Sequence, residues 1–374
     1  MPLVFDWTSS VTGPGPRRNP RRSGGSRQAE DRSQPDLTIG LINNMKDGAL
    51  ETTERQFLSL LADASEDRLV KLRFYQLPGI PRKNSIAHHV EESYSDINTL
   101  WNTSLDGLIV TGREPSNARL QDEPYWKDFV RLLDWAHDHT TSTIWSCLAA
   151  HAAVLHMDGI SRTRNNWKHS GLFGCETLSR HPIIEAVPPR FLMPHSRWNG
   201  LEEKQLLQRG YDVLTVSPRV GVDTFIKQHQ SLFIFFQGHP EYESHTLLLE
   251  YRRDVARYLR RQAAVYPSIP RSYFDDETVA ALCEIQHAAQ RYPREILLHE
   301  LSAVFENVAI THAWRQTAVS LYKNWLHHLA VAKGLPPLRT PSNSLSHDVP
   351  QRKHIANARE SDSHPMSIPV HSTQ

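Results

Sequence analysis

Two short motifs carry side chains that could act as a nucleophile and as its base. The first is Cys147, which stands between the apolar run 142–146 and a run of small residues that begins at Leu148. At such a strand-to-helix turn, the free backbone N–H groups and the positive end of the helix dipole lower a thiol pKa and can hold an oxyanion. The alternative interpretation is a small buried hydrophobic side chain at the end of a strand.

The second motif is Gly-His-Pro-Glu at 238–241, which follows the apolar run 232–236. In extended backbone, side chains two residues apart lie on the same side, so the carboxylate of Glu241 can orient the imidazole of His239. Together with a cysteine, this pair supplies thiolate formation, proton transfer and tautomer control, which acyl transfer through a thioester requires. The alternative is a loop histidine that is capped by a nearby acid.

Metal and cofactor motifs are weak in this sequence. The 21 histidines include the pairs 88–89 and 327–328. Adjacent histidines point in different directions, and neither HExxH nor a His-carboxylate set at ligand spacing occurs, so we expect no metal site. Neither GxGxxG nor GxxxxGK[ST] occurs, so we expect no dinucleotide cofactor and no P-loop.

The elements that must position these residues alternate along the chain. Hydrophobic patterns predict strands at 37–42, 69–76, 105–110, 142–146, 211–216 and 232–236, and helices at 51–64, 125–138, 148–157 and 246–264. Repeated strand-then-helix order predicts an α/β fold with a mostly parallel sheet and helices on both faces, a three-layer, flavodoxin-like arrangement. Functional residues in such folds lie just after strands, which is where both motifs occur.

Both ends of the chain are poor in apolar side chains. Residues 1–36, rich in Arg, Pro and Gly, and residues 334–374 are predicted to be disordered, because they cannot bury enough surface to offset the entropy of ordering. One folded domain is expected at 37–333, with 275–333 mostly helical. The six arginines of 12–35 could alternatively contact nucleic acid or serve as an organelle address.

Charge and cysteine content exclude several classes of protein. The 42 Lys and Arg residues nearly balance the 41 Asp and Glu residues, which leaves no global field to hold nucleic acid or a membrane surface. The three cysteines are far apart and show no CxxC spacing, which fits a reducing compartment. No apolar run approaches the roughly 20 residues that cross a bilayer. We therefore expect a soluble, cytoplasmic protein.

The sequence resembles the homoserine O-succinyltransferase (transsuccinylase) family, which has a class I glutamine amidotransferase-like fold, over about residues 37–330. The resemblance rests on segments that occur in order and at compatible spacing: IGLINNM, ETTERQFLSLL, DGLIVTG, EPYWKDFVRLLDWAHDHTTSTIWSC, KHSG, FLMPHSRW, GHPEYE, an Arg-Asp pair and KNWLHHL. Such a series is far more specific than any single motif.

The resemblance implies a role for each residue of the two motifs. Cys147 would be the acyl-accepting nucleophile, His239 the proton acceptor and Glu241 its partner. Backbone groups of Leu148 and Gly112 would form the oxyanion hole. General amidotransferases flank the cysteine with glycines, whereas this chain has Trp and Ala at 145 and 149, which favours transsuccinylase chemistry over glutaminase activity.

The resemblance also implies substrate-binding residues. The lysine, serine and arginine of the family fall on Lys168, Ser196 and Arg253. A guanidinium fork suits the carboxylate of an amino-acid acceptor, and the serine and neighbouring acids suit its ammonium or hydroxyl. The alternative for Lys168 and Arg253 is an ordinary solvated role on the surface.

A loop after the strand 105–110 departs from the family pattern. The family's Thr-Gly-Ala-Pro is replaced by Thr-Gly-Arg-Glu-Pro-Ser, and ungapped counting back from the cysteine puts Ser116 at the position that helps decide the acyl donor. Serine leaves room for a four-carbon acyl group, and Arg113 could meet its terminal carboxylate, whereas Glu114 could repel that group and favour acetyl. Succinyl is slightly favoured over acetyl.

These expectations describe a homoserine O-acyltransferase of methionine biosynthesis. It would take the acyl group from succinyl-CoA or acetyl-CoA and pass it through a cysteine thioester to the hydroxyl of L-homoserine, with no bound cofactor. The alternatives are a serine O-acyltransferase, a glutamine amidotransferase-type hydrolase and a non-catalytic binding protein. A homodimer is possible. The segment 275–307 is longer than its family counterpart and could shape the acceptor pocket or a subunit contact.

Overall fold

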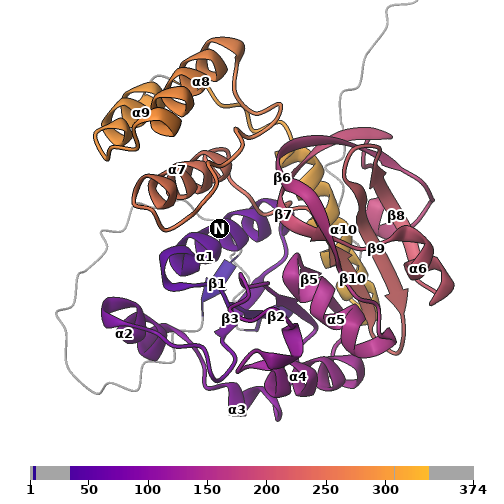
Figure 1. Ribbon diagram of the computed structural model, residues 1–374. Helices are drawn as coiled ribbons and strands as arrows, with labels where there is room; N and C mark the ends of the chain where they lie inside the picture. The colour runs from indigo at the N-terminus through magenta and orange to yellow at the C-terminus, as the bar shows by residue number, and fades with distance from the viewer. Residues whose placement is uncertain (1–2, 6–33, 307, 337–374) are drawn as a thin grey trace, which may run out of the picture. The chain divides into compact units, whose positions relative to one another are not determined.

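The computed structural model describes residues 3–5, 34–306 and 308–336 (Figure 1). All of them belong to one compact unit, residues 1–338, which is the unit described below. The second unit, residues 339–374, lies outside the described residues.

Most of the two predicted tails, 1–36 and 334–374, also lies outside the described residues. Within the predicted N-terminal tail the structure describes one strand, β1 (Leu3–Phe5), which pairs in parallel with β3 (Val70–Tyr75). Three residues are too few to show a periodic pattern, and the open edge of the sheet supplies their hydrogen bonds.

A single ten-stranded sheet forms the centre of the described structure, in the order β1-β3-β2-β4-β5-β10-β9-β8-β6-β7. The strands from β1 to β10 in this order pair in parallel, and the four beyond β10 pair in an antiparallel manner. The remaining strands are β2 (Leu37–Ile42), β4 (Gly107–Val110), β5 (Ser142–Ser146), β6 (Thr163–Thr177), β7 (Arg190–Gly200), β8 (Asp212–Ser217), β9 (Gly221–Gln228) and β10 (Leu232–Phe236). Buried strands such as β10 are uniformly apolar because helices cover both of their faces.

Helices cover both faces of the sheet. One hydrophobic cluster joins β2 and β3 to α1 and α10, and another joins β4 and β5 to α4 and α5. The helices are α1 (Asp47–Ala64), α2 (Asn84–Ser93), α3 (Ile97–Leu100), α4 (Trp126–His139), α5 (Leu148–Asp158), α6 (Glu203–Gln208), α7 (Thr246–Leu259), α8 (Asp276–Arg291), α9 (Leu297–Glu306) and α10 (Arg315–Ala332). The predicted α/β fold, with helices on both faces of the sheet, is confirmed.

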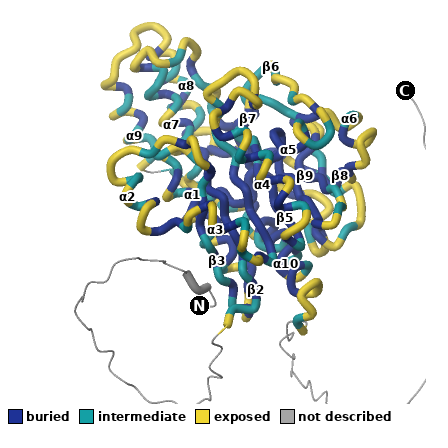
Figure 2. The backbone as a smooth tube through the Cα atoms, turned by 90° about the horizontal axis from the view of Figure 1, so that it is seen from below, coloured by how far each residue is buried: buried dark blue, intermediate teal, exposed yellow. Residues whose placement is uncertain are grey.

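A third hydrophobic cluster joins α7, α8 and α9 and is centred on buried side chains such as Tyr251, Leu282 and Trp314. The segment expected to be mostly helical, 275–333, contains α8, α9 and α10. Figure 2 shows the central strands as buried and much of the outer helices and loops as exposed. In this third cluster α7 packs against α8 and α9, apart from the two clusters that cover the central strands.

Three long strands were not expected from the sequence. β6, β7 and β9 form most of the antiparallel part of the sheet. The first half of β6 is polar and largely exposed, so it shows no run of apolar residues. Its pairing with β7 also shifts register between Arg164 and His169, which interrupts the alternation that predicts a strand.

The pairing of β5 with β10 determines where the two motifs meet. These strands are parallel neighbours in which Ser146 lies opposite Phe236. The backbone N–H of Cys147 then donates a hydrogen bond to the carbonyl of Phe236 at 2.7 Å. The chains that leave the two strands, toward Cys147 and toward His239, therefore start side by side at the carboxyl edge of the sheet.

Candidate active site

Cys147 occupies a strained turn between β5 and α5. It is the residue before the first helical residue and has φ 50° and ψ −109°, a backbone conformation that L-residues rarely adopt. The hydrogen bond from its N–H to Phe236 holds the turn in place. Alanines at 149, 150, 152 and 153 let α5 pack closely after so sharp a turn. The thiol side chain is only partly buried, so a substrate can reach it.

His239 and Glu241 form the pair that their spacing predicted. His239 Nδ1 lies 2.8 Å from Glu241 Oε1, and both residues are buried. The backbone N–H of His239 donates to the carbonyl of Pro194 in β7 at 2.8 Å, and its ring stacks on Tyr242 with centroids 4.2 Å apart. These contacts leave Nε2 as the ring nitrogen that can exchange a proton.

The protonation of His239 is governed by its two partners. Burial alone lowers its pKa, but the charges of Glu241 and Cys147 raise it, and the net pKa lies well above the ordinary value. A histidine with a raised pKa beside a cysteine can keep the proton that the thiol gives up. The arrangement can therefore hold a thiolate next to an imidazolium.

Gly112 brings the loop after β4 against the first turn of α5. A Cβ at this position would lie 2.6 Å from the backbone nitrogen of Leu148, closer than any side chain tolerates. The first N–H groups of a helix have no partner within the helix. The backbone at Gly112 and the N–H of Leu148 thus meet beside Cys147, as an oxyanion hole requires.

The three residues expected to bind the acceptor lie around α7. Lys168 Nζ lies 2.8 Å from Asp254 Oδ2, and Arg253 Nε lies 2.9 Å from Asp254 Oδ1. Ser196 donates to Glu250, which also accepts a hydrogen bond of 2.9 Å from Tyr242. The structure therefore connects all three to acids on one helix.

Sequence reasoning assigned no role of their own to the acids Glu250 and Asp254. They stand four residues apart on α7, and Arg253 lies three residues after the first of them. That i, i+3, i+4 spacing was visible in the sequence and puts the three side chains on adjoining parts of one helix face. Five arginines at 252–261 obscured it, because they suggest a solvated basic helix.

The candidate residues of the loop expected to influence the acyl donor make different contacts. Glu114 pairs with Lys46 at 2.8 Å and lies 3.7 Å from Arg257, and although burial raises its pKa, the hydrogen bond and charge of Lys46 leave that pKa below its usual range. The backbone N–H of Ser116 donates to Glu123 at 2.6 Å, while its side chain is exposed. Cations therefore compensate the negative charge of Glu114.

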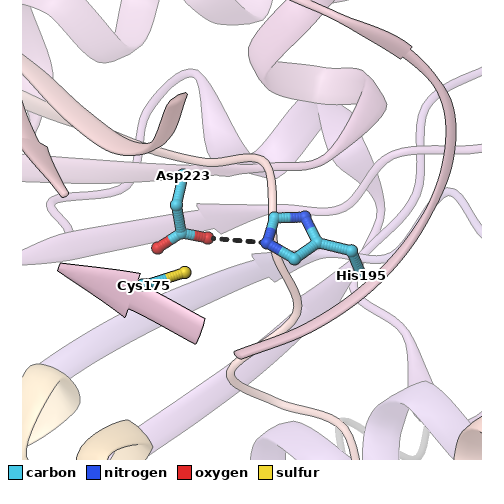
Figure 3. Close-up of side chains that lie close together, drawn as sticks. All are labelled: Cys175, His195 and Asp223. Carbon is cyan, nitrogen blue, oxygen red and sulfur yellow. Dashed lines mark ion pairs between the residues drawn. The ribbon is translucent and has the colours of Figure 1, made fainter. Parts of the chain in front are cut away.

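A buried cluster is formed by Cys175 of β6, His195 of β7 and Asp223 of β9 (Figure 3). Asp223 Oδ1 lies 3.3 Å from His195 Nε2, and the other carboxylate oxygen accepts from two threonines, Thr215 and Thr224. The possible ligand atoms of Cys175, His195 and Asp223 lie within 4.8 Å of one another, as a metal site would need.

The contacts of this cluster fit a paired histidine and aspartate better than a metal site. Arg197 Nε donates to His195 Nδ1 at 3.3 Å, so a neutral His195 carries its proton on Nε2, the nitrogen that faces Asp223. A metal-bound histidine donates from its other ring nitrogen, which the guanidinium of Arg197 prevents here. Burial also raises the pKa of the Cys175 thiol, which opposes the thiolate that a metal would bind.

The fold and the site together define an α/β protein with a mixed sheet, in which a cysteine at a strand-to-helix turn lies beside a histidine–glutamate pair. The family model described as "Homoserine O-succinyltransferase" matches residues 24–334. The chain belongs to the homoserine O-succinyltransferase family, and it is accordingly an acyltransferase.

Curated relatives and solved structures are similar to this chain to different degrees. A homoserine O-succinyltransferase of Rhodopseudomonas palustris is 42% identical over 338 residues, which cover 88% of this chain and 99% of the relative. One of Bradyrhizobium japonicum is 44% identical over 335 residues, with the same coverage of 88% and 99%. A glutamine amido transferase structure from Methylobacillus Flagellatus has 13% identity and a TM-score of 0.44, covering 78% of this chain and 94% of that one.

Within residues 3–5, 34–306 and 308–336, no helix combines the length and the apolar character that crossing a membrane requires.

Proposed function

We propose that this protein is a homoserine O-succinyltransferase that moves a succinyl group from succinyl-CoA to the hydroxyl of L-homoserine through a thioester on Cys147. The observation that carries the proposal is the hydrogen bond of 2.7 Å from Cys147 N–H to Phe236, because it fixes the nucleophile turn to the strand that leads into the His239–Glu241 pair. The names of the relatives support succinyl as the acyl group.

The first half-reaction forms the acyl-enzyme. The thiolate of Cys147 attacks the carbonyl carbon of the acyl-CoA thioester, the new C–S bond forms, and the carbonyl oxygen becomes an oxyanion held by backbone N–H groups at Leu148 and Gly112. The oxyanion then collapses, the bond to the CoA sulfur breaks, and CoA leaves with the proton that His239 held. His239 is left neutral, with Glu241 fixing its Nδ1 proton.

The second half-reaction transfers the acyl group to the acceptor. His239 Nε2 takes the proton from the homoserine hydroxyl as its oxygen attacks the acyl-enzyme carbonyl. Collapse of the second oxyanion breaks the bond to the Cys147 sulfur, which restores the thiolate beside the imidazolium and releases O-succinylhomoserine. No oxidant, metal ion or water enters the balance.

The acceptor would be held between α7 and the sheet. Arg253 suits its carboxylate, while Ser196 and Glu250, already in contact with each other, suit its ammonium group. Lys168 and Asp254 would keep Arg253 in place through the shared carboxylate. This order of residues favours an amino acid with a side-chain hydroxyl, homoserine or the shorter serine.

The identity of the acyl donor, succinyl-CoA rather than acetyl-CoA, is the most specific part of the proposal. Glu114 is engaged by Lys46 and Arg257, so its charge opposes a dicarboxylic acyl group less than its position in the loop suggests. Arg113 has no such acid partner in the described residues, and Ser116 leaves space. These features support succinyl over acetyl. A cytoplasmic location and a homodimer remain predictions alongside it.

Thiol release tests the proposal. Wild type is assayed with succinyl-CoA and acetyl-CoA, each with homoserine, serine or no acceptor, beside Cys147→Ala. We expect turnover with succinyl-CoA and homoserine, none by the variant, and a stoichiometric acyl-enzyme when the acceptor is omitted. Turnover by Cys147→Ala, or ammonia release from glutamine without any need for acyl-CoA, would overturn the mechanism.

A further inference from the structure

A cavity of about 270 Å³ lies along the flank of α5, close to the lower end of the range for small-molecule sites. It is lined by Ala118, Arg119, Leu120, Gln121, His151, Leu155, Ser161 and Arg162. His151 and Leu155 are four residues apart and lie on one face of α5, and His151 is the fourth residue of the helix that Cys147 directly precedes. The cavity therefore starts about one helical turn, or roughly 5.4 Å, from the nucleophile.

Arg162 connects this cavity with the nucleophile. Its side chain lines the cavity and is half-buried, and burial lowers its pKa while the neighbouring Tyr125, Cys147 and Glu123 raise it. Within the described part of the chain, its guanidinium makes no hydrogen bond or ion pair. The other arginine of the lining differs, because Arg119 lies 3.9 Å from Asp122.

Arg113 is a second arginine without an acid partner among the described residues, and it lies in the loop after β4. Its Nε is buried and has no hydrogen-bond partner among the described residues. Burial and the charge of Glu123 raise the pKa of Tyr125 to about 12, and the two charges that oppose them are those of Arg113 and Arg162. The charges of both guanidinium groups therefore act on Tyr125.

Glu123, the acid whose charge acts on Arg162, forms no ion pair with either arginine. Glu123 is buried, and its Oε1 accepts hydrogen bonds of 2.6 Å from the backbone N–H groups of Ser116 and Asn117. Arg162 lines the cavity, the charge of Arg113 acts on the same tyrosine, and neither has an ion-pair partner among the described residues, so the two guanidinium groups can hold a small anion.

We propose that Arg162, assisted by Arg113, binds the terminal carboxylate of the acyl group while the thioester carbonyl lies at Cys147. The inference rests on the proposed acyl transfer and adds the group that selects a dicarboxylic donor. In a succinyl group the two carbonyl carbons are three C–C bonds apart, about 4 Å when extended at roughly 1.5 Å per bond. Adding the C–S bond to the nucleophile, that length matches the single helical turn between Cys147 and the start of the cavity.

The test compares donors that differ in one group. Full-length wild type, Arg162→Ala and Arg162→Lys are assayed with succinyl-CoA, butyryl-CoA and acetyl-CoA at saturating homoserine. Butyryl-CoA has the chain length of succinyl-CoA without the carboxylate. The control is Arg164→Ala, an exposed arginine of the same segment that stacks on Trp198 instead. Thermal melting of each variant verifies folding.

We expect Arg162→Ala to lower kcat/KM for succinyl-CoA about 10- to 100-fold, the loss of one charged hydrogen bond, and to change butyryl-CoA and acetyl-CoA less than threefold. Arg162→Lys should retain part of the succinyl activity, and the control should resemble wild type. An equal loss for all three donors would overturn the inference, because it would place Arg162 on the CoA phosphates. The inference would also be overturned if Arg162→Ala kept the wild-type kcat/KM for succinyl-CoA, or if wild type accepted acetyl-CoA alone. If wild type uses no donor, the proposed function itself fails.

Discussion

Gly112 and the backbone nitrogen of Leu148 lie so close that a Cβ on the glycine would be 2.6 Å from that nitrogen. The two residues come from loops that follow different strands, β4 and β5, which are parallel neighbours in the sheet. A residue with a side chain at 112 would push the loop away from the first turn of α5. The contact therefore ties the identity of one residue to the geometry of the oxyanion hole.

Gly112→Ala should lower kcat by about 10²- to 10³-fold and leave KM within a factor of three. The reason is that displacement of one oxyanion donor costs transition-state stabilisation and not ground-state binding. Steady-state kinetics measure the effect. Gly48→Ala is the matched control, since a Cβ there meets nothing within 4 Å. A kcat equal to that of the control would contradict the assigned oxyanion hole.

Glu241→Gln should lower the pKa of His239. Burial lowers this pKa and the charge of Glu241 is the largest effect that raises it, so removing the charge leaves burial less opposed. NMR titration of the His239 ring in wild type and variant measures the shift. An unchanged titration would show that Glu241 does not control the imidazole.

The same pair makes stability depend on pH. Because the folded pKa of His239 is raised, the stabilisation is complete below the unfolded pKa of about 6.5 and is lost as pH rises through the folded pKa. Urea unfolding of wild type should therefore show a contribution that falls with rising pH above about 6.5. In Glu241→Gln this contribution should be smaller, because only Cys147 then raises the pKa of His239, and a parallel pH dependence in both proteins would contradict the assignment.

Arg253→Ala should raise KM for homoserine by about 10- to 100-fold with a smaller change in kcat, because a carboxylate loses a charged hydrogen-bond partner. KM for acyl-CoA should stay unchanged. Arg252→Ala is the control, since Arg252 is the preceding residue of α7 and is exposed. An equal effect of both substitutions on homoserine would assign the change to the charge of the helix rather than to a specific contact.

Asp223→Asn should destabilise the fold by about 1–3 kcal/mol, because His195 and two threonines lose a charged acceptor in a fully buried place. Gly238 packs against the same carboxylate, and a Cβ there would lie 2.5 Å from Asp223 Oδ1. A part of the effect should therefore reach kcat through the adjacent His239. Denaturant unfolding gives the stability, with Asp212→Asn as the exposed control on β8. Tight, stoichiometric zinc binding by wild type would contradict the hydrogen-bonded interpretation of this cluster.

The two candidate catalytic motifs could be predicted because their signals are local. Cys147 and His239 each follow a short apolar strand, and in a parallel sheet such positions collect at one edge whatever the rest of the chain does. The spacing of two residues between His239 and Glu241 likewise fixed their shared side, and the 2.8 Å contact confirms it.

Other parts of the site could not be predicted because their partners are distant in sequence. Asp223 lies 28 residues after His195, and only the antiparallel strands bring them to 3.3 Å. Glu114 seemed a free acid in the donor loop until Lys46, 68 residues earlier, was seen to pair with it. Arg162 stands in a polar segment that resembles a solvated surface, and its place beside the cavity depends on where β6 begins.

By itself, the sequence determined the alternating α/β order, the nucleophile turn and the histidine–carboxylate pair, since hydrophobic period and nearest-neighbour geometry act within a few residues. Only the tertiary structure decided which charges are compensated, which arginines remain without an acid, and how close Gly112 comes to Leu148. Those properties depend on through-space distances and burial, which are set by sheet order and helix packing rather than by any one segment.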